Sequence, residues 1–180
     1  MGKAGKGRAA AKRPGTRSDL QHGALCYRMR EGEPEILLVT SRGTGRWIIP
    51  KGWPVPGEDG AGSALVEAWE EAGVRGRAAS APIGRYGYTK ALADGEEIPL
   101  TVEVWPVAVE TLADRFPERK ERRRKWFGPK KAARKVQEAE LARLIRRFGK
   151  SLEAMAAASA APSPGPARGP GADQEDVTSR

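Results

Sequence analysis

Three glutamates in the middle of the chain have the spacing of a metal site. Glu67, Glu70 and Glu71 stand at offsets i, i+3 and i+4, so a helix over residues 61–72 would hold them close together. Like charges at that spacing repel one another, and a cation would remove the repulsion. Mg²⁺ prefers oxygen ligands, commonly carboxylates together with substrate phosphates. The spacing therefore predicts a magnesium site for phosphate chemistry, although a solvated acidic helix face would show the same pattern.

The residues around the glutamates predict a unit that would hold them in place. Residues 46–50 have the composition of a strand and lead into Lys51 and Gly52. A loop rich in proline and glycine follows over residues 53–62, and such residues separate regular elements. Gly73 is a helix-stop residue directly after the predicted helix. The expected order is strand, glycine-rich loop, carboxylate helix and stop.

Residues 52–74 resemble the Nudix box, the signature of the Nudix hydrolases. The family pattern spaces a glycine, a glutamate, an Arg-Glu pair, a Glu-Glu pair and a final glycine over this length. The chain matches that pattern at Gly52, Glu58, Glu67, Ala68, Glu70, Glu71, Gly73 and Val74. The one departure is Val66, which stands where the family has arginine. An arginine there could pair with Glu70 one helical turn away, and valine cannot.

The resemblance implies a fold and a reaction. The fold is the Nudix fold over about residues 24–148, an α/β (α+β) fold with a mixed β-sheet sandwiched between α-helices. The reaction is hydrolysis of a diphosphate linkage assisted by Mg²⁺ or Mn²⁺. Glu67 and Glu71 would be metal ligands, Glu70 a ligand or a neighbour of the ligands, and the backbone carbonyl of Gly52 a further ligand. Glu70 is also the expected general base.

Two further stretches resemble one subgroup, the diphosphoinositol polyphosphate phosphohydrolases. They are residues 36–50, ILLVTSRGTGRWIIP, and residues 122–127, RRRKWF. This resemblance implies substrates such as diphosphoinositol polyphosphates and diadenosine polyphosphates, whose many phosphates need many guanidinium and ammonium donors. The candidate substrate-binding residues are Arg42, Arg46, Lys51, Arg122 and Arg124. The simpler interpretation of each is a solvated surface charge.

Composition favours an anionic ligand. The formal net charge is +9 and the sequence pI is about 10.0, so polyanions are attracted more than cations. The single cysteine, Cys26, excludes an intramolecular disulfide and is expected in the core of a protein from a reducing, cytoplasmic compartment. No apolar stretch approaches the length of a membrane span. The expected partner is a small polyphosphate substrate and not a membrane.

Composition also divides the chain into three parts. Residues 1–18 are basic and poor in apolar side chains, and we expect them to be disordered. Residues 19–150 contain the predicted hydrolase domain, and residues 151–180 form an Ala/Pro-rich stretch that is also expected to be disordered. The basic stretch is most simply a solubilising tail, and the alternative is an arm that binds nucleic acid.

Apolar runs predict the elements of the domain. Predicted strands cover residues 24–27, 35–40, 46–50, 84–90 and 98–109. The first two and the last two form hairpins, the later one turning near Asp94 and Gly95. Pro106 predicts an edge or a bulge, because proline cannot donate to a sheet. Residues 129–148 predict one helix that begins at Pro129.

Three functions compete on these grounds. The first is a metal-dependent enzyme acting on a small polyphosphate. The second is a Nudix enzyme acting on nucleotides or RNA 5′ ends, which needs aromatic side chains near the pocket for stacking. Candidates for that stacking are Trp53, Trp69, Tyr86 and Tyr88. The third is a non-catalytic binding module. Such a module would be expected to have lost some of the carboxylates of the box, whereas this chain has every one of them.

Overall fold

The computed structural model describes residues 19–91 and 95–160. The expectations for residues 1–18, for residues 161–180 and for the turn at Asp94 lie outside this part of the chain. The elements are β1 (Leu20–Arg30), β2 (Glu33–Thr40), β3 (Trp47–Ile48), β4 (Lys51–Gly52), α1 (Gly60–Ala72), β5 (Val74–Ala78), β6 (Gly84–Ala91), β7 (Glu97–Leu112), β8 (Arg124–Phe127), α2 (Pro129–Lys135) and α3 (Ala139–Ala160).

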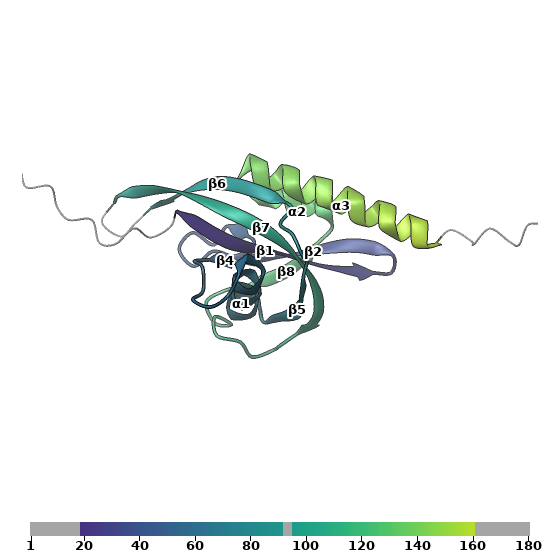
Figure 1. The fold of residues 1–180 in the computed structure, drawn as a ribbon, viewed down its shortest axis with the longest axis horizontal. Helices are drawn as coiled ribbons and strands as arrows, with labels where there is room; N and C mark the ends of the chain where they lie inside the picture. Colours follow the sequence, from purple (N-terminus) through teal and green to yellow (C-terminus); the bar gives the residue numbers. More distant parts are fainter. Residues whose placement is uncertain (1–18, 92–94, 161–180) are drawn as a thin grey trace, which may run out of the picture.

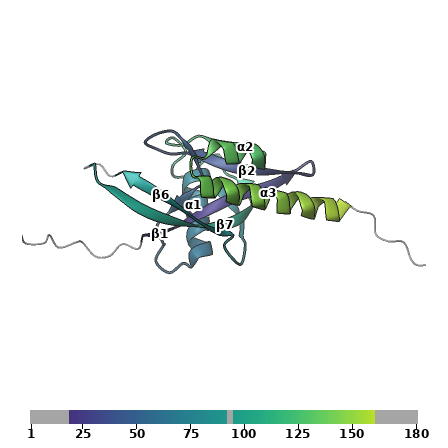
Figure 2. The ribbon, with the colours of Figure 1, turned by 90° about the horizontal axis from the view of Figure 1, so that it is seen from above.

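One mixed sheet lies between helices on both faces, as expected. Figure 1 shows α1 on one side of the sheet and α3 with α2 on the other. Viewed from above in Figure 2, α2 and α3 lie in front of the strands and α1 lies behind them. Strand β1 runs parallel to β7, whereas the remaining strand pairs are antiparallel. The α+β class and the sandwiched mixed sheet are therefore confirmed.

Two hydrophobic cores, one on each face, explain the continuous apolar run of β2. Ile36 and Leu38 pack in the core under α2 and α3, whereas Leu37 and Val39 pack in the core under α1. Side chains of a strand alternate between faces, so a strand covered on both sides is apolar throughout. Cys26 of β1 is fully buried in the α1 core, which confirms its expected position.

Of the strand predicted over residues 46–50, only Trp47 and Ile48 form a strand, β3, and a separate short strand, β4, follows at Lys51 and Gly52. β3 pairs with the end of β2, whereas β4 pairs with the beginning of β1, where Gly52 lies opposite His22. Further along, β1 pairs with β2 instead. Gly52, the first residue of the box, is therefore held in the sheet beside the part of β1 that no longer pairs with β2. This separation provides the space in which the site is built.

Pro106 lies neither on an edge strand nor at a bulge, so that prediction was wrong: it pairs in unbroken register with Leu25 of β1, and the register shift of β7 against β5 falls between Arg75 and Gly76. It belongs to β7, which has β1 on one side and β5 and β6 on the other. The backbone oxygens of Val104 and Pro106 accept bonds from Ile83 and Ala79, in the connection between β5 and β6. The N–H and C=O of a residue face the same side of a strand. The missing N–H of Pro106 therefore faces the connection between β5 and β6, where no strand pairs with β7 on that side.

The helix predicted over residues 129–148 is two helices, and the second is longer than expected. Val136 has extended backbone angles and ends α2, and α3 begins three residues later. α3 then continues to Ala160, through residues 151–160 of the expected disordered tail, so that part of the expectation is wrong. This segment reads SLEAMAAASA, and alanine is the strongest helix former, which explains the extension. Within the described ranges, no helix combines the length and apolar character needed to cross a membrane.

Candidate active site

Helix α1 carries the three glutamates and is closed at both ends by local bonds. The Asp59 side chain accepts a hydrogen bond of 2.7 Å from the Gly62 N–H, which caps the N-terminus. Gly73 ends the helix with φ 65°, a conformation that favours glycine, and its N–H bonds to the carbonyls of Ala68 and Trp69. The predicted helix and its predicted stop are thus confirmed.

A cavity of about 650 Å³ brings most of the predicted site residues together. It is lined by the three α1 glutamates and Glu118, and by the cations Arg42, Arg46, Lys51 and Arg122. Gly52, Gln21, Tyr88 and Trp53 also line it. Carboxylates at one end and cations at the other therefore share one space, which is the arrangement that a metal-assisted reaction of phosphates requires.

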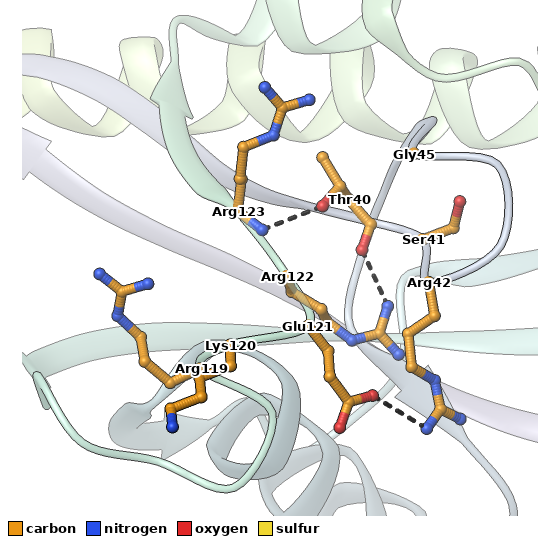
Figure 3. A pocket seen from close by; sticks show the side chains of 9 residues that line it. All are labelled: Thr40, Ser41, Arg42, Gly45, Arg119, Lys120, Glu121, Arg122 and Arg123. Atoms are coloured by element: carbon orange, nitrogen blue, oxygen red, sulfur yellow. Dashed lines mark hydrogen bonds and ion pairs between the residues drawn. The ribbon is translucent and has the colours of Figure 1, made fainter.

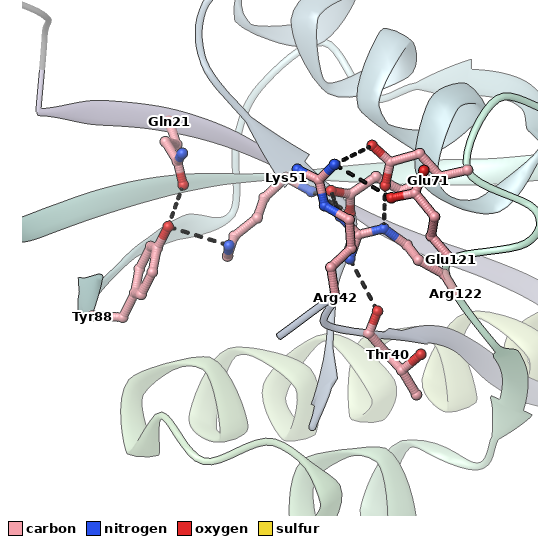
Figure 4. Close-up of polar contacts among 9 residues, drawn as sticks. Gln21, Thr40, Arg42, Lys51, Glu71, Tyr88, Glu121 and Arg122 are labelled. Atoms are coloured by element: carbon pink, nitrogen blue, oxygen red, sulfur yellow. Dashed lines mark hydrogen bonds and ion pairs between the residues drawn. The ribbon is translucent and has the colours of Figure 1, made fainter. Parts of the chain in front are cut away.

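A buried ion pair joins the two kinds of charge (Figure 4). The Arg122 guanidinium donates to the Glu71 carboxylate, and both side chains are less than one-tenth exposed. The same guanidinium donates to Glu118 at 2.5 Å and to the Thr40 carbonyl at 3.0 Å. Each of the three nitrogens of Arg122 thus donates a hydrogen bond, which fixes the guanidinium beside these carboxylates.

Arg122 provides a guanidinium to the carboxylates of α1, although not to Glu70, the residue that an arginine at position 66 could reach. The family's arginine would lie on α1 itself, whereas the guanidinium here comes from the loop between β7 and β8. That loop is tied back to the helix by a 3.0 Å bond from the Glu118 N–H to the Glu70 carbonyl. The carboxylates of α1 therefore have a cationic partner, but it comes from a segment about fifty residues away and it contacts Glu71 rather than Glu70.

Glu67 lies directly against Gly52. A Cβ atom at Gly52 would overlap the Glu67 carboxylate, so only glycine leaves room for it there. Burial raises the pKa of Glu67 to about 7, and the charges of Glu70 and Glu118 act in the same direction. Burial also raises the pKa of Glu71, while Arg122 opposes that shift. The negative charge at this end is thus incompletely compensated by the protein's own cations.

The donor set fits a hard divalent cation, although the ligands are not drawn together around one point. Over residues 19–91 and 95–160, no group of three or more His, Cys, Asp or Glu side chains is arranged closely enough to hold a metal ion. The chemistry nevertheless suits Mg²⁺ or Mn²⁺, because the donors are carboxylate oxygens whose ionisation a cation would favour. The space that Gly52 leaves beside Glu67 agrees with this assignment.

At the other end of the cavity, Lys51 is held by uncharged groups. Its ammonium donates to the Tyr88 hydroxyl at 3.2 Å and lies 4.4 Å from the centre of the Tyr88 ring. The Tyr88 hydroxyl donates in turn to Gln21 at 2.7 Å, as Figure 4 shows. Burial lowers the pKa of Lys51, and Arg46 adds to that effect while Glu71 opposes it. Among the described residues Lys51 makes no ion pair, so its charge is available to an anion.

The two arginines of the loop before β3 differ in exposure. Arg42 is exposed and pairs at 3.4 Å with Glu121 and at 3.6 Å with Glu118. Arg46 is half-buried and donates to Gln137 at 2.8 Å and to Glu138 at 2.9 Å. Both line the cavity, which agrees with a substrate-binding role. Gln137 and Glu138, which accept these bonds from Arg46, lie in the break between α2 and α3.

Arg124 does not line the cavity, and its predicted substrate role has no support in its position. Its guanidinium donates at 2.6 Å to the Ala72 carbonyl, at the C-terminal end of α1. It also lies 5.0 Å from the centre of the Phe116 ring. A cation at a helix C-terminus satisfies a free carbonyl and stabilises the helix dipole. Arg124 therefore holds the helix that carries the site.

The sequence interpretation missed the roles of several residues of the cavity, and three of them contribute to its charges and hydrogen bonds. Glu118 was treated only as an interruption of a basic run, yet it is a fourth carboxylate facing Glu67 and Glu71. Gln21 lies just before the first predicted strand, and Tyr88 was considered only as a stacking residue. Among the other aromatic candidates, Trp53 lines the cavity, Tyr86 is buried in a core and Trp69 stacks with Arg75 outside it.

A family model described as the NUDIX domain matches residues 19–148 of the chain. The match covers well over half of the protein and includes every element that lines the cavity. The fold, with its sheet between helices and its capped carboxylate helix, agrees with it. The chain therefore belongs to the Nudix family.

A relative among curated proteins is human diphosphoinositol polyphosphate phosphohydrolase 3-alpha. It is 50% identical over 54 residues, a stretch that covers 29% of this chain and 32% of the relative. Human diphosphoinositol polyphosphate phosphohydrolase 2 is 40% identical over 53 residues, covering 29% of each chain. The chain thus spans about a third of the length of the curated relatives that it matches.

A solved structure extends the likeness over the whole domain. The chain is similar to a C. elegans Ap4A hydrolase in a binary complex, with a TM-score of 0.59 and 26% identity. The likeness covers 75% of this chain and 98% of that chain.

Proposed function

We propose that the chain is a divalent-metal-dependent pyrophosphohydrolase that cleaves a diphosphate linkage in a small polyphosphate. The observation that carries the proposal is the single cavity in which four carboxylates face Arg42, Arg46 and Lys51. The named relatives agree with this class, since one hydrolyses diphosphoinositol polyphosphates by its name and the other is named as an Ap4A hydrolase.

The carboxylate end would hold the metal. Glu67 and Glu71, with Glu70 and the Gly52 carbonyl as further donors, would bind Mg²⁺ or Mn²⁺. A bound cation of this kind supplies Lewis-acid stabilisation of the negative charge on phosphoryl oxygens. Glu70 is exposed on the same helix and is our candidate for the base that accepts a proton from the attacking water. Arg122 would orient Glu71 and oppose the burial that raises its pKa.

The cationic end would bind the phosphates. Lys51 offers a buried ammonium without a carboxylate partner within the described residues, and Arg46 and Arg42 offer guanidinium groups along the same wall. Charge-assisted bonds to phosphate are among the strongest hydrogen bonds in proteins. A substrate lying across the cavity would place one phosphate near the metal and its neighbours near these cations.

Diadenosine polyphosphates, or other nucleotides, are the second candidate substrates. Trp53 and Tyr88 line the cavity, and aromatic rings can stack on nucleobases. A diphosphoinositol polyphosphate carries its phosphates on an inositol ring and has no nucleobase. It would bind through the cations of the cavity and would not stack on Trp53. The ratio of the two activities therefore reports which kind of substrate the cavity favours.

The test is hydrolysis of a panel with Mg²⁺ and then Mn²⁺. The panel contains a diphosphoinositol polyphosphate, diadenosine polyphosphates, ADP-ribose, nucleoside triphosphates and 5′-triphosphate RNA. We expect turnover of the first two, reduced by at least about 100-fold in Glu70→Gln/Glu71→Gln. Glu110→Gln, which alters an exposed glutamate paired with Arg77, is the matched control and keeps its activity. Silence across the panel with both metals would overturn the proposal in favour of a binding module.

A further inference from the structure

A second hollow lies directly beside the cavity, and we call it the outer pocket. It has a volume of about 620 Å³ and is lined by Thr40, Ser41, Arg42, Gly45, Arg119, Lys120, Glu121, Arg122 and Arg123 (Figure 3). Ser41, Arg42 and Arg122 line the cavity as well. The two spaces therefore share a wall, so groups bound in the outer pocket lie next to the cavity.

The outer pocket is strongly cationic. Five of its lining side chains are arginine or lysine, against one acidic residue, Glu121. Arg42 and Arg122 already have carboxylate partners. Arg119, Lys120 and Arg123 are exposed, and none of the three forms an ion pair with another residue in the part of the chain that the structure describes. Three positive charges are thus gathered at this rim without a partner.

The backbone beneath these charges is fixed. Thr40 and Arg123 exchange bonds, because the Thr40 N–H donates to the Arg123 carbonyl and the Arg123 N–H donates to the Thr40 hydroxyl, both at 2.9 Å. The Glu118 N–H donates to the Glu70 carbonyl of α1 at 3.0 Å. In Figure 3 the long side chains spread from this fixed segment, with Arg123 on one side of Arg122 and Arg119 and Lys120 on the other. They can fold onto a ligand while their attachment points remain in place.

The lining also indicates the class of ligand. It contains hydroxyl, guanidinium and ammonium groups but no aromatic or large apolar side chain. Nucleic acid bound as a single strand would need stacking surfaces for its bases, which these residues do not offer. Several phosphates carried on a small frame need only donors and positive charge, and arginine is well suited to bind them.

We propose that the outer pocket binds the phosphate groups of a polyphosphate substrate that are remote from the bond being cleaved. The inference rests on the proposed function and deepens it. It assigns Arg119, Lys120 and Arg123 to the recognition of highly phosphorylated substrates, beyond the cations that line the cavity itself. Selectivity for the number of phosphates would then arise from this loop and not from the carboxylate helix.

The kinetic test compares two variants that lose the same charge. In Arg119→Ala/Lys120→Ala/Arg123→Ala, KM for a diphosphoinositol polyphosphate, divided by KM for diadenosine triphosphate, an expected substrate with few phosphates, should rise about tenfold, the scale expected for losing several exposed ion pairs. In Arg143→Ala/Arg146→Ala/Lys150→Ala, which changes exposed cations of α3, that ratio should stay within about twofold of the starting value. An equal rise in both variants, or no rise in the first, would overturn the proposal.

A binding test separates this proposal from the proposed function. Inositol hexakisphosphate carries no diphosphate linkage, so calorimetry with it measures recognition without turnover. Its Kd should weaken about tenfold in the Arg119/Lys120/Arg123 triple variant and much less in the α3 variant. That result, combined with no hydrolysis of any substrate, would keep the outer pocket and reject the enzyme. Hydrolysis combined with an unchanged Kd would keep the enzyme and reject the outer pocket. Displacement of the inositol phosphate by single-stranded RNA at equal phosphate concentration would also overturn the proposal.

Discussion

The two ends of the cavity are built in different ways. The carboxylate end comes mainly from one element, since Glu67, Glu70 and Glu71 lie within five residues of a helix capped by Asp59 and Gly73. The cationic end is assembled from several separate segments. They are the loop before β3 with Arg42 and Arg46, β4 with Lys51, β6 with Tyr88 and the start of β1 with Gln21.

This difference has a chemical reason. Adjacent carboxylates repel one another, and only a regular element held by its own hydrogen bonds keeps them together without a cation. Phosphate-binding cations must instead surround a ligand from several directions, and one helix face cannot provide that. Arg122 belongs to neither group, because it is cationic but is bonded to Glu71 and Glu118. It is the residue through which the two ends depend on each other.

Removal of Arg122 should have the largest effect. Arg122→Ala removes the ion-pair partner of the buried Glu71 and leaves it only the bond from the Lys51 N–H, and breaking a buried ion pair costs about 3–5 kcal/mol of unfolding free energy. Arg42→Ala removes an exposed arginine of the same wall and should cost no more than about 1 kcal/mol. Urea unfolding of both variants measures the contrast. Equal losses would show that the two ends are independent and that Arg122 does not join them.

A change at Gly52 should disturb the carboxylate end alone. Because a Cβ atom there would overlap the Glu67 carboxylate, Gly52→Ala should displace that side chain and lower kcat about 100-fold. Gly128→Ala is the matched control, since a Cβ at Gly128 meets nothing within 4 Å. Steady-state kinetics on the best substrate of the panel distinguishes them. Full activity in Gly52→Ala would mean that the position of Glu67 is unimportant for the reaction.

A change at Lys51 should act on binding at the cationic end. Lys51→Met keeps much of the side-chain volume and removes the ammonium, so KM should rise about tenfold, a loss of one charge-assisted bond, with a smaller change in kcat. Tyr88→Phe removes only the hydroxyl that holds Lys51 and should raise KM less. If Lys51→Met lowers kcat and leaves KM unchanged, Lys51 acts on the reacting phosphate instead.

A further effect should be a dependence of stability on pH in EDTA. Because the pKa of Glu67 is raised from 4.5 to about 7 in the folded protein, the unfolded state releases this proton more easily. The contribution of Glu67 to stability is therefore present below about pH 4.5 and is lost as the pH rises through about 7. Glu67→Gln should remove this part of the slope, and Mg²⁺ should reduce it. Thermal unfolding between pH 5 and 8 measures both, and identical slopes in the two proteins would contradict the assignment.

The elements that depend on local pattern were predicted well. Helix α1, its glycine stop and the β1–β2 and β6–β7 hairpins follow from hydrophobic periodicity and turn residues, which act over a few neighbours. The errors concern features that depend on contacts between residues far apart in the chain. Nothing local distinguishes one helix from the pair α2 and α3, because the break is stabilised by Gln137 and Glu138 bonding to Arg46 of a distant loop. The position of Pro106 likewise depends on which strands become its neighbours.

The sequence by itself determined the chemistry of this protein: the carboxylates of one helix, the glycines at Gly52 and Gly73, and an excess of cations. These features are local because helical periodicity and backbone freedom are properties of adjacent residues. Only the tertiary structure decided which cations serve the site. Arg122 and Arg124 are two residues apart, a spacing that would put both side chains on one face of a strand. Arg122 instead lies in the loop before β8 and bonds to Glu71, whereas Arg124 begins β8 and bonds to the end of α1, so tertiary packing and not spacing separates their roles.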